Sequence, residues 1–475
     1  MIPIAIAYGD GIGPEIMKAT LLVLKEANAP LELHEVEVGE KVYLKGVANG
    51  IDPASWETLR HTKAFLKAPI TTPQGGGFKS INVTVRTTLG LYANVRPCAA
   101  YSPFIATKHP KMDLVVIREN EEDLYTGIEY RQTPQVYKSL KLISRPGSEK
   151  IVRYAFDYAR HYGRKKVTCF TKDNVMKISD GLFHKVFDEI AKEYPDIAHE
   201  HWIVDIGAAK LADTPEVFEV IVMPNLYGDI LSDVAAQISG SVGIAGSANI
   251  GERGAMFEAI HGSAPRIAGQ NLANPSGLLL GSVLMLLHLN ELTVAELVHN
   301  AWLCTIEGGI HTYDIFKEGI SKEKVGTLEF AKAIVKNLGN TPHTLPAVRY
   351  TGNTKITTLT TQKPAAFSQR ELVGIDLFVY CKESAKSFIQ KASTHAWKTL
   401  ELKAITNRGV KVWPEGHEET LCVDQFRLRF LSKGDRPIEF DLLAKTAQEA
   451  HLLGCDITGT EHLYTFEGKE AFSTI

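Results

Sequence analysis

Short apolar runs alternate with amphipathic stretches through the first 340 residues of the chain. Apolar runs of strand length occupy residues 2–8, 64–69, 114–117, 166–171, 201–205 and 219–224. Between them, apolar positions recur with a helical period, as at 14–27 and 152–161. Run 278–289 is the most apolar, and it is too short to span a bilayer, so it predicts a buried helix. The alternation predicts an α/β fold.

Residues 341–370 have a different character, with prolines, many threonines and no sustained period. Such a composition predicts a linker between domains. Residues 371–475 then give the element order β-α-β-β-β-α-β, in which 373–379 alternate as a strand and 438–453 follow a helical pattern. We therefore predict a large domain at 1–340 and a small α+β domain at 371–475, ferredoxin-like in its element order.

Composition narrows the class of protein. With 44% hydrophobic and 23% charged residues, the chain has the make-up of a soluble globular protein, and its net charge of −3 gives no general affinity for nucleic acid. The cysteines form no CxxC pair, which predicts reduced thiols rather than a disulfide framework or a cysteine zinc site. The N-terminus lacks a signal-peptide pattern. We expect a cytoplasmic protein that binds neither membranes nor nucleic acid.

Two aspartates in the stretch NLYGDILSD, Asp229 and Asp233, are the first candidates for chemistry. If the stretch is helical, their spacing of four places both carboxylates on one face of the helix. Like charges at that distance repel, so a cation should lie between them unless both face solvent, and carboxylate oxygens suit Mg²⁺ or Mn²⁺. The alternative is a solvated helix face.

Anion-binding groups gather in the segment that begins ITTPQGGG. Gly75, Gly76 and Gly77 predict a flexible loop there. After it come Ser80, Asn82, Arg86 and Arg96, and Arg118 ends the strand at 114–117. Arginine forks are natural partners for carboxylate or phosphate, although each arginine alone could be a surface ion pair. The glycines of GDGIGPEI are not spaced as GxGxxG, so they indicate a strand–helix turn rather than a pyrophosphate site.

Further polar residues follow predicted strands. Tyr125 lies in the loop after Arg118, Lys177 stands at a predicted helix start, and Asp205 ends the run at 201–205. A small-residue segment then carries His261, Arg266 and Asn274, and such a loop allows close backbone approach to a ligand. A solvated lysine and a purely structural connection are the alternative interpretations.

Several motifs together resemble the isocitrate/isopropylmalate family of β-decarboxylating dehydrogenases. They are GDGIGPEI, ITTPQGGG, LYANVRP, RENEEDLYTG, NLYGDILSD and HGSAPRIAGQNLANP, in the order found in the family. The resemblance covers about residues 2–340 and implies the family's two-subdomain fold, which is not a Rossmann fold. Residues 371–475 resemble the added small α+β domain of an extended bacterial subclass.

The resemblance also implies an activity: oxidative decarboxylation of isocitrate to 2-oxoglutarate and CO₂. The isocitrate-using members place a serine and an asparagine before the first substrate arginine, as in KSINVTVR here. By this likeness Ser80, Asn82, Arg86, Arg96 and Arg118 bind substrate, Asp205, Asp229 and Asp233 bind Mg²⁺ or Mn²⁺, and Tyr125 and Lys177 transfer protons. Asp205 and Lys177 would come from the second subunit of a homodimer, so that each active site is shared.

The cofactor expected from the resemblance is NADP. The residues that would contact it are Thr72, His261, Gly262, Ser263, Ala264, Arg266, Asn274, Tyr313 and Lys317. NAD-specific members carry an acidic residue where this chain has Arg266, and a guanidinium can pair with a 2′-phosphate. Ile267 and Ala273 are instead typical of NAD-type members.

Three alternatives remain open at this point. The chain could be an NAD-dependent homoisocitrate dehydrogenase, an NAD-dependent isopropylmalate dehydrogenase, or a non-catalytic regulatory subunit of the same family. An isopropyl group would favour apolar side chains where Ser80 and Asn82 stand. Regulatory subunits tend to lose metal or substrate residues, and this chain retains them.

Overall fold

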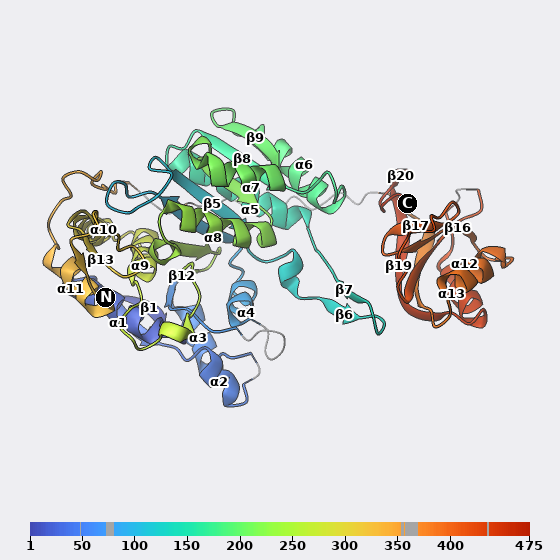
Figure 1. The fold of residues 1–475 in the computed structure, drawn as a ribbon, viewed down its shortest axis with the longest axis horizontal. Helices are drawn as coiled ribbons and strands as arrows, with labels where there is room; N and C mark the ends of the chain where they lie inside the picture. Colours follow the sequence, from blue (N-terminus) through green and yellow to red (C-terminus); the bar gives the residue numbers. More distant parts are fainter. Residues whose placement is uncertain (48, 73–79, 353–355, 357–368, 435–436) are drawn as a thin grey trace. The chain divides into compact units, whose positions relative to one another are not determined.

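The computed structural model describes the chain except for residues 48, 73–79, 353–355, 357–368 and 435–436 (Figure 1). The expected glycine loop at Gly75, Gly76 and Gly77 lies outside the described residues. The chain divides into two compact units. Unit 1 comprises Met1–Thr126 and Leu142–Thr360, and unit 2 comprises Gly127–Lys141 and Thr361–Ile475.

A ten-stranded sheet forms the centre of unit 1, in the order β2-β1-β3-β12-β11-β4-β5-β10-β8-β9. Its strands are β1 Ile2–Ala7, β2 Leu31–Glu35, β3 Ala64–Lys67, β4 Ala93–Ala99, β5 Asp113–Glu119, β8 Lys166–Thr171, β9 Ala198–Ile203, β10 Val220–Met223, β11 Gly246–Ile250 and β12 Ala255–Ala259. Neighbours are parallel except across β12-β11-β4-β5, where the pairing is antiparallel. Two parallel halves therefore meet at an antiparallel seam, which is unlike a Rossmann sheet.

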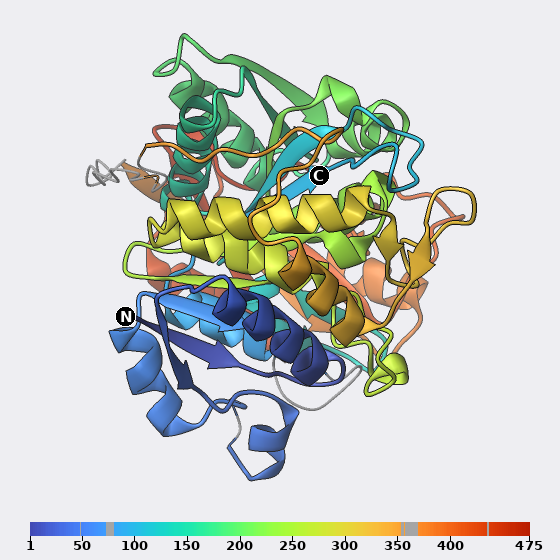
Figure 2. The same ribbon diagram turned by 90° about the vertical axis from the view of Figure 1, so that its left-hand side faces the viewer.

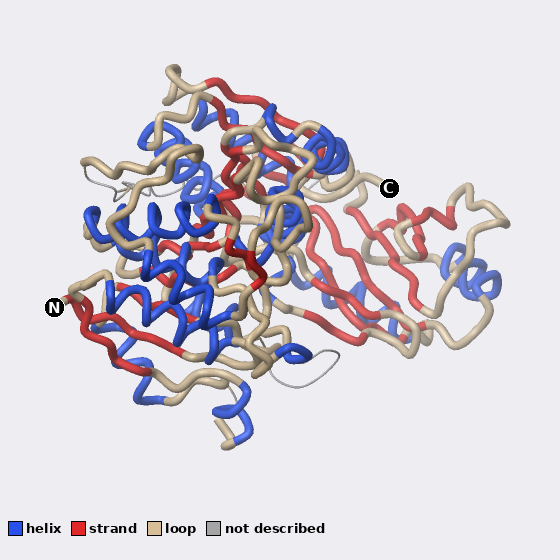
Figure 3. The backbone as a smooth tube through the Cα atoms, turned by 60° about the vertical axis from the view of Figure 1, so that its left-hand side comes forward, coloured by secondary structure: helices blue, strands red, loops and turns tan. Residues whose placement is uncertain are grey.

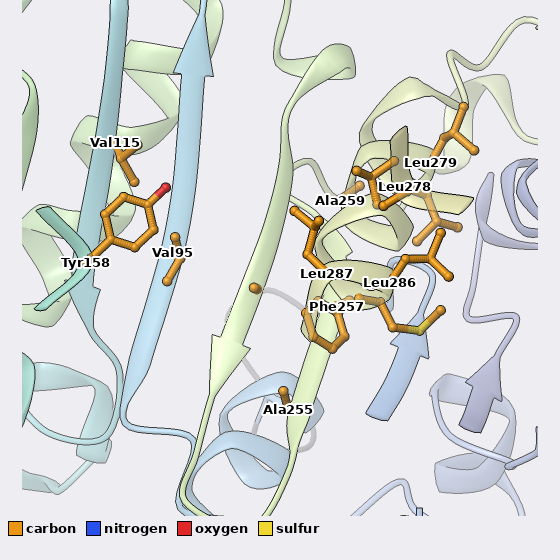
Figure 4. Packing of buried hydrophobic residues seen from close by; sticks show 14 of the residues in the cluster. Val95, Val115, Tyr158, Ala255, Phe257, Ala259, Leu278, Leu279, Leu286 and Leu287 are labelled. Atoms are coloured by element: carbon orange, nitrogen blue, oxygen red, sulfur yellow. The ribbon is translucent and has the colours of Figure 1, made fainter. Parts of the chain in front are cut away.

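Helices pack around this sheet (Figures 2 and 3). They are α1 Gly13–Glu26, α2 Glu40–Leu44, α3 Pro53–His61, α4 Ile81–Thr88, α5 Arg145–His161, α6 Ser179–Ala191, α7 Val204–Asp213, α8 Asn225–Ser239, α9 Ser276–His288, α10 Leu292–Glu307 and α11 Thr327–Lys336. The predicted buried helix is confirmed as α9, whose Leu286 and Leu287 face Phe257 of β12 in the core (Figure 4). Among the described residues, no helix combines the length and the apolar character needed to cross a membrane.

Helix α8 begins directly after the buried strand β10, with Pro224 at its N-cap. Small and apolar residues, from Gly228 to Ala236, recur on its buried face at helical spacing. The helix ends at Gly240, whose φ of 146° lies in a region that favours glycine. The predicted helical setting of Asp229 and Asp233 is therefore confirmed.

Unit 2 is built on an antiparallel sheet in the order β17-β16-β18-β15-β19-β20. Its elements are β15 Arg370–Tyr380, α12 Ala385–Thr394, β16 Glu401–Asn407, β17 Val410–Trp413, β18 Gln425–Leu431, α13 Phe440–Leu452, β19 Asp456–Phe466 and β20 Lys469–Glu470. This confirms the predicted element order, extended by the two-residue strand β20. The central order β16-β18-β15-β19 is that of a ferredoxin-like sheet.

A hairpin from the middle of the chain joins this second unit. Its strands are β6 Glu129–Arg131 and β7 Tyr137–Ser139. Thr133 donates a hydrogen bond to Asp424 (2.6 Å), and Lys138 lies 3.0 Å from Glu461 and 4.7 Å from the centre of the Phe378 ring. Pattern analysis of residues 1–340 gave no sign of this grouping, because the contacts span some of the longest sequence separations in the chain.

Candidate active site

A cavity of about 180 Å³ collects most of the residues predicted to bind substrate. Its lining includes Ser80, Asn82, Arg86, Arg96, Arg118, Tyr125, Asp229, His261 and Gly262. Lys67 of β3 and Glu258 of β12 also line it, and the sequence analysis missed both. In all, four basic side chains face two carboxylates in the cavity. This excess of positive charge suits an anionic ligand.

Arg118 is the most deeply buried of the three arginines in the cavity. It is 1% exposed, and its Nε and Nη2 donate to the Asn225 side chain at 3.0 and 2.7 Å. Its Nη1 donates to the Asp229 carboxylate. A Cβ on Gly228 would lie 2.5 Å from Arg118 Cγ, so only glycine lets α8 close over this side chain. Burial, followed by Arg96 and Arg86, lowers the Arg118 pKa to about 10, which leaves it charged at neutral pH.

Arg96 connects β4 to both aspartates of α8. Its Nη2 lies 3.4 Å from Asp229 Oδ1 and its Nη1 lies 3.4 Å from Asp233 Oδ1, while Ser232 accepts a hydrogen bond at 2.6 Å. Burial would raise the pKa of Asp229, but Arg118 and Arg96 hold it below its usual range. Burial raises the pKa of Asp233 despite Arg96. Asp229 thus faces cationic groups in the cavity wall, whereas the Asp233 side chain is 58% exposed.

The two carboxylates fit a divalent cation in their chemistry, because hard oxygen ligands are those that Mg²⁺ and Mn²⁺ prefer. In this chain both Asp229 oxygens already accept hydrogen bonds. Oδ1 accepts from Arg118 and Arg96, and Oδ2 accepts from the Tyr125 hydroxyl. A cation at Asp229 would therefore share this carboxylate with the arginines or displace the Tyr125 hydroxyl.

Glu258 holds two of the cavity's cations in place. Its carboxylate lies 2.7 Å from Lys67 Nζ and 2.9 Å from Arg86 Nη2, and all three side chains are buried. Burial would raise the pKa of Glu258, yet Lys67 and Arg86 hold it far below its usual range. A lysine inside the apolar strand AFLK and a glutamate inside AMFEA were the available sequence signals.

Three buried polar atoms at the cavity have no hydrogen-bond partner within the described chain. They are Asn82 Oδ1, Arg86 Nε and His261 Nε2. A buried polar atom without a hydrogen-bond partner costs free energy. A ligand that supplies the missing hydrogen bonds therefore binds more tightly. Burial also lowers the pKa of His261, which leaves the imidazole neutral.

A second cavity, of about 330 Å³, adjoins the first because His261 and Gly262 line both. Ala264, Ile267, Ala273, Asn274 and Tyr313 line it as well. Asp314, which the sequence analysis did not single out, fixes the surrounding loops: its carboxylate accepts hydrogen bonds from Ser241 (2.6 Å), Thr312 (2.6 Å) and Asn274 (3.1 Å). This cavity is where the structure gathers much of the predicted cofactor set.

The other predicted cofactor residues stand around these cavities rather than in their walls. Ser263 is buried and its hydroxyl lies 2.8 Å from that of Thr71, while the Thr72 hydroxyl lies 3.5 Å from that of Ser80. Arg266 and Lys317 are exposed and line neither cavity.

Lys177 and Asp205 do not join Asp229 within this chain. Lys177 is exposed in the turn before α6, and Asp205 is in the first turn of α7 with its side chain 67% exposed. Lys172 Nζ lies 2.9 Å from Asp205 Oδ1, and this hydrogen bond lowers the pKa of Asp205. Neither residue lines the arginine cavity. One chain therefore presents two separate parts of the predicted site.

Comparison with known proteins defines the class. Residues 3–334 match the isocitrate/isopropylmalate dehydrogenase family, and the chain belongs to that family. Residues 370–475 match the C-terminal domain of bacterial isocitrate dehydrogenase. Both units thus resemble members of the family that carry the added domain, which confirms the predicted fold class.

Similar proteins cover nearly the whole chain. An NADP isocitrate dehydrogenase from Rickettsia bellii is 53% identical over 99% of this chain and 98% of its own length. The Thermus thermophilus NADP isocitrate dehydrogenase is 42% identical, over 99% and 95%. A crystal structure of a Thermus thermophilus protein superposes with a TM-score of 0.93 at 41% identity, covering 99% of this chain and 95% of that one.

Proposed function

We propose that the protein oxidises and decarboxylates isocitrate to 2-oxoglutarate and CO₂, with hydride transfer to NADP and a requirement for Mg²⁺ or Mn²⁺. The observation that carries this proposal is the cavity in which Arg86, Arg96 and Arg118 converge beside Asp229. Three guanidinium groups match the three carboxylates of isocitrate. The names of the NADP-dependent relatives, which cover both units, support the choice of substrate and cofactor.

The arginines would bind and orient the substrate. Arg118 is fixed by Asn225 and Arg86 by Glu258, so their forks need little reordering on binding. Asn82 Oδ1 has no partner among the residues that the structure describes and would accept a hydrogen bond from the substrate, while Ser80 lines the same cavity. Polar groups at these two positions disfavour an apolar isopropyl substituent, which argues against isopropylmalate.

Proton transfers would be made by Tyr125 and Lys177. A divalent cation held by Asp229, Asp233 and the Asp205 of a second subunit would lower the pKa of the substrate hydroxyl and stabilise the electrons left by CO₂. Lys177, also from the second subunit, would relay the hydroxyl proton. Tyr125 lines the cavity, and burial raises its pKa to about 12, so it is protonated and able to donate to the enolate carbon.

The residues lining the second cavity would hold NADP, which would supply the hydride acceptor when bound. His261 and Gly262 line both cavities, so they mark where the nicotinamide would meet the substrate. Among the described residues His261 Nε2 has no hydrogen-bond partner, and it would hydrogen-bond the cofactor or the substrate. The exposed cations Arg266 and Lys317 would pair with the 2′-phosphate.

The test is the absorbance of reduced nicotinamide in the presence of isocitrate and Mg²⁺, with NADP and NAD in separate assays. We expect turnover that is faster with NADP and that stops on chelation of the metal. Turnover with homoisocitrate or isopropylmalate instead would support those NAD-dependent activities. No turnover with any of the three substrates would support a regulatory subunit.

The C-terminal unit is proposed to strengthen a homodimer. This unit includes the β6–β7 hairpin, which in the sequence lies between Thr126 and Leu142 of unit 1. Removing residues 350–475 deprives Thr133 and Lys138 of their partners Asp424 and Glu461. We expect the truncated protein to have a lower mass in solution by light scattering, whereas an unaltered oligomer would contradict the proposal.

A further inference from the structure

Three side chains with metal-binding groups meet outside both cavities. They are Asp173 in the turn after β8, His184 of α6 and His201 of β9. Their ligand atoms all lie within 4.8 Å of one another, and each residue is partly buried. None of them lines the arginine cavity or the adjoining one. The substrate and cofactor sites therefore leave this cluster unexplained.

The contacts within the cluster are close. His184 Nδ1 lies 2.7 Å from Asp173 Oδ2, and His201 Nε2 lies 3.9 Å from Asp173 Oδ1. The two imidazole rings stack with centroids 3.5 Å apart and an interplanar angle of 15°. Both rings thus present a nitrogen to the same carboxylate, one from α6 and one from β9, the next element along the chain.

We propose that Asp173, His184 and His201 form a second cation site, selective for Zn²⁺ or a similar borderline transition metal such as Ni²⁺ or Co²⁺. Two imidazoles and one carboxylate are the ligand set that such metals prefer, whereas Mg²⁺ prefers oxygen alone. The site thus differs in kind from the aspartates proposed to serve catalysis. Zinc ligands lie about 2.0–2.1 Å from the ion, which places neighbouring ligand atoms about 3.3 Å apart. The two rings would rotate out of their stacked arrangement so that both lone pairs converge on one ion.

Binding of a metal ion to this cluster would be coupled to the release of a proton. Burial, followed by repulsion from His184, lowers the pKa of His201. Burial would raise the pKa of Asp173, but the hydrogen bond from His184 keeps it low, so the carboxylate is ionised. A metal ion bound at His184 Nδ1 would therefore displace the proton that this nitrogen donates to Asp173.

A neighbouring carboxylate supports the orientation of His184. Asp188 Oδ2 lies 3.6 Å from His184 Nε2, on the opposite side of the ring from the nitrogen that faces Asp173. A carboxylate behind a histidine ligand is the usual arrangement that fixes its tautomer and strengthens its metal bond. At His201, the Thr171 hydroxyl lies 2.8 Å from Nε2 and would rotate away or add an oxygen to the site.

The test is calorimetric titration of the full-length protein with Zn²⁺ in excess Mg²⁺, which occupies sites made of carboxylates alone. We expect one Zn²⁺ per chain and a rise in Tm on binding, because the ion would tie the turn after β8 to α6 and β9. His184→Gln and His201→Gln should each weaken binding by at least ~10-fold. The control is His199→Gln, an exposed histidine on the same strand, which should bind as the wild type does.

Asp173→Asn provides a second variant that keeps both imidazoles, in case a histidine substitution disturbs folding; circular dichroism checks each fold. Loss of Zn²⁺ binding in folded Asp173→Asn supports the site. The proposal is overturned if the wild type binds no Zn²⁺ in excess Mg²⁺, or if folded His184→Gln, His201→Gln and Asp173→Asn all bind it with unchanged affinity. The cluster would then be a metal-free hydrogen-bonded pair with a stacked neighbour.

Discussion

Two helices of unit 1 carry the aspartates proposed to bind the catalytic cation, and their surroundings differ. On α8, Asp229 lines the cavity and accepts hydrogen bonds from Arg96, Arg118 and Tyr125. On α7, Asp205 has a side chain that is 67% exposed and contacts only the nearby Lys172 among the ion pairs of the described residues. Asp229 is held by hydrogen bonds in the cavity, while Asp205 lies outside it. This difference is what a site shared between two subunits would produce.

The largest effect expected from a substitution in the cavity is at Asp229. Asp229→Asn removes a proposed cation ligand and the carboxylate that pairs with Arg96 and Arg118. We expect turnover to fall by about 10³-fold or more while the helical content is retained. Steady-state rates and circular dichroism measure both effects. Asp213→Asn, on an exposed residue at the end of α7, is the control, and equal losses in both variants would contradict the assignment.

A substrate arginine should affect binding more than chemistry. Arg86→Gln leaves Glu258 paired with Lys67 but removes a guanidinium group from the cavity. We expect kcat/KM for isocitrate to fall by about 10²-fold, chiefly through KM, because a charge-assisted carboxylate contact is lost. Arg60→Gln, which removes a guanidinium stacked near Trp56, serves as the control. A normal KM in Arg86→Gln would argue against substrate contact.

The preference for NADP over NAD should depend on the exposed cations Arg266 and Lys317. Arg266→Asp combined with Lys317→Ser removes two positive charges outside the cavity walls. We expect the ratio of kcat/KM for NADP to that for NAD to fall by about 10-fold or more, because the 2′-phosphate loses its partners. Lys322→Ser is a matched surface control. Unchanged cofactor kinetics in the double variant would exclude the proposed phosphate contacts.

The smallest effect concerns stability rather than catalysis. Burial lowers the pKa of His299 from 6.5 to about 4. The unfolded chain therefore binds more protons than the folded one in this range, so the free energy of unfolding falls as pH decreases from 6.5 through about 4. His299→Gln should flatten that dependence in urea titrations, and His161→Gln, an exposed substitution, should leave it intact. If the free energy of unfolding depends equally steeply on pH in His299→Gln, other groups cause the dependence.

The sequence predicted much of the fold because its elements are local. The periods of α8, α9 and the strands of unit 2 follow from neighbouring residues, and the family motifs marked the arginines now seen in one cavity. Lys67 and Glu258 were missed because their pairing joins strands far apart in sequence. For the same reason the sequence did not predict that the β6–β7 hairpin belongs to the C-terminal unit. Periodicity records burial, whereas these features depend on contacts between distant segments.

The shared site can be tested most directly by complementation between two inactive variants. Asp205→Asn and Asp229→Asn homodimers should each be inactive, and a hybrid of the two would contain one site with both defects and one site with neither. Random assembly from equal amounts should therefore restore about a quarter of the wild-type turnover. If the mixed protein, shown by mass to contain hybrids, remains inactive, Asp205 and Asp229 do not act in one site formed across two subunits.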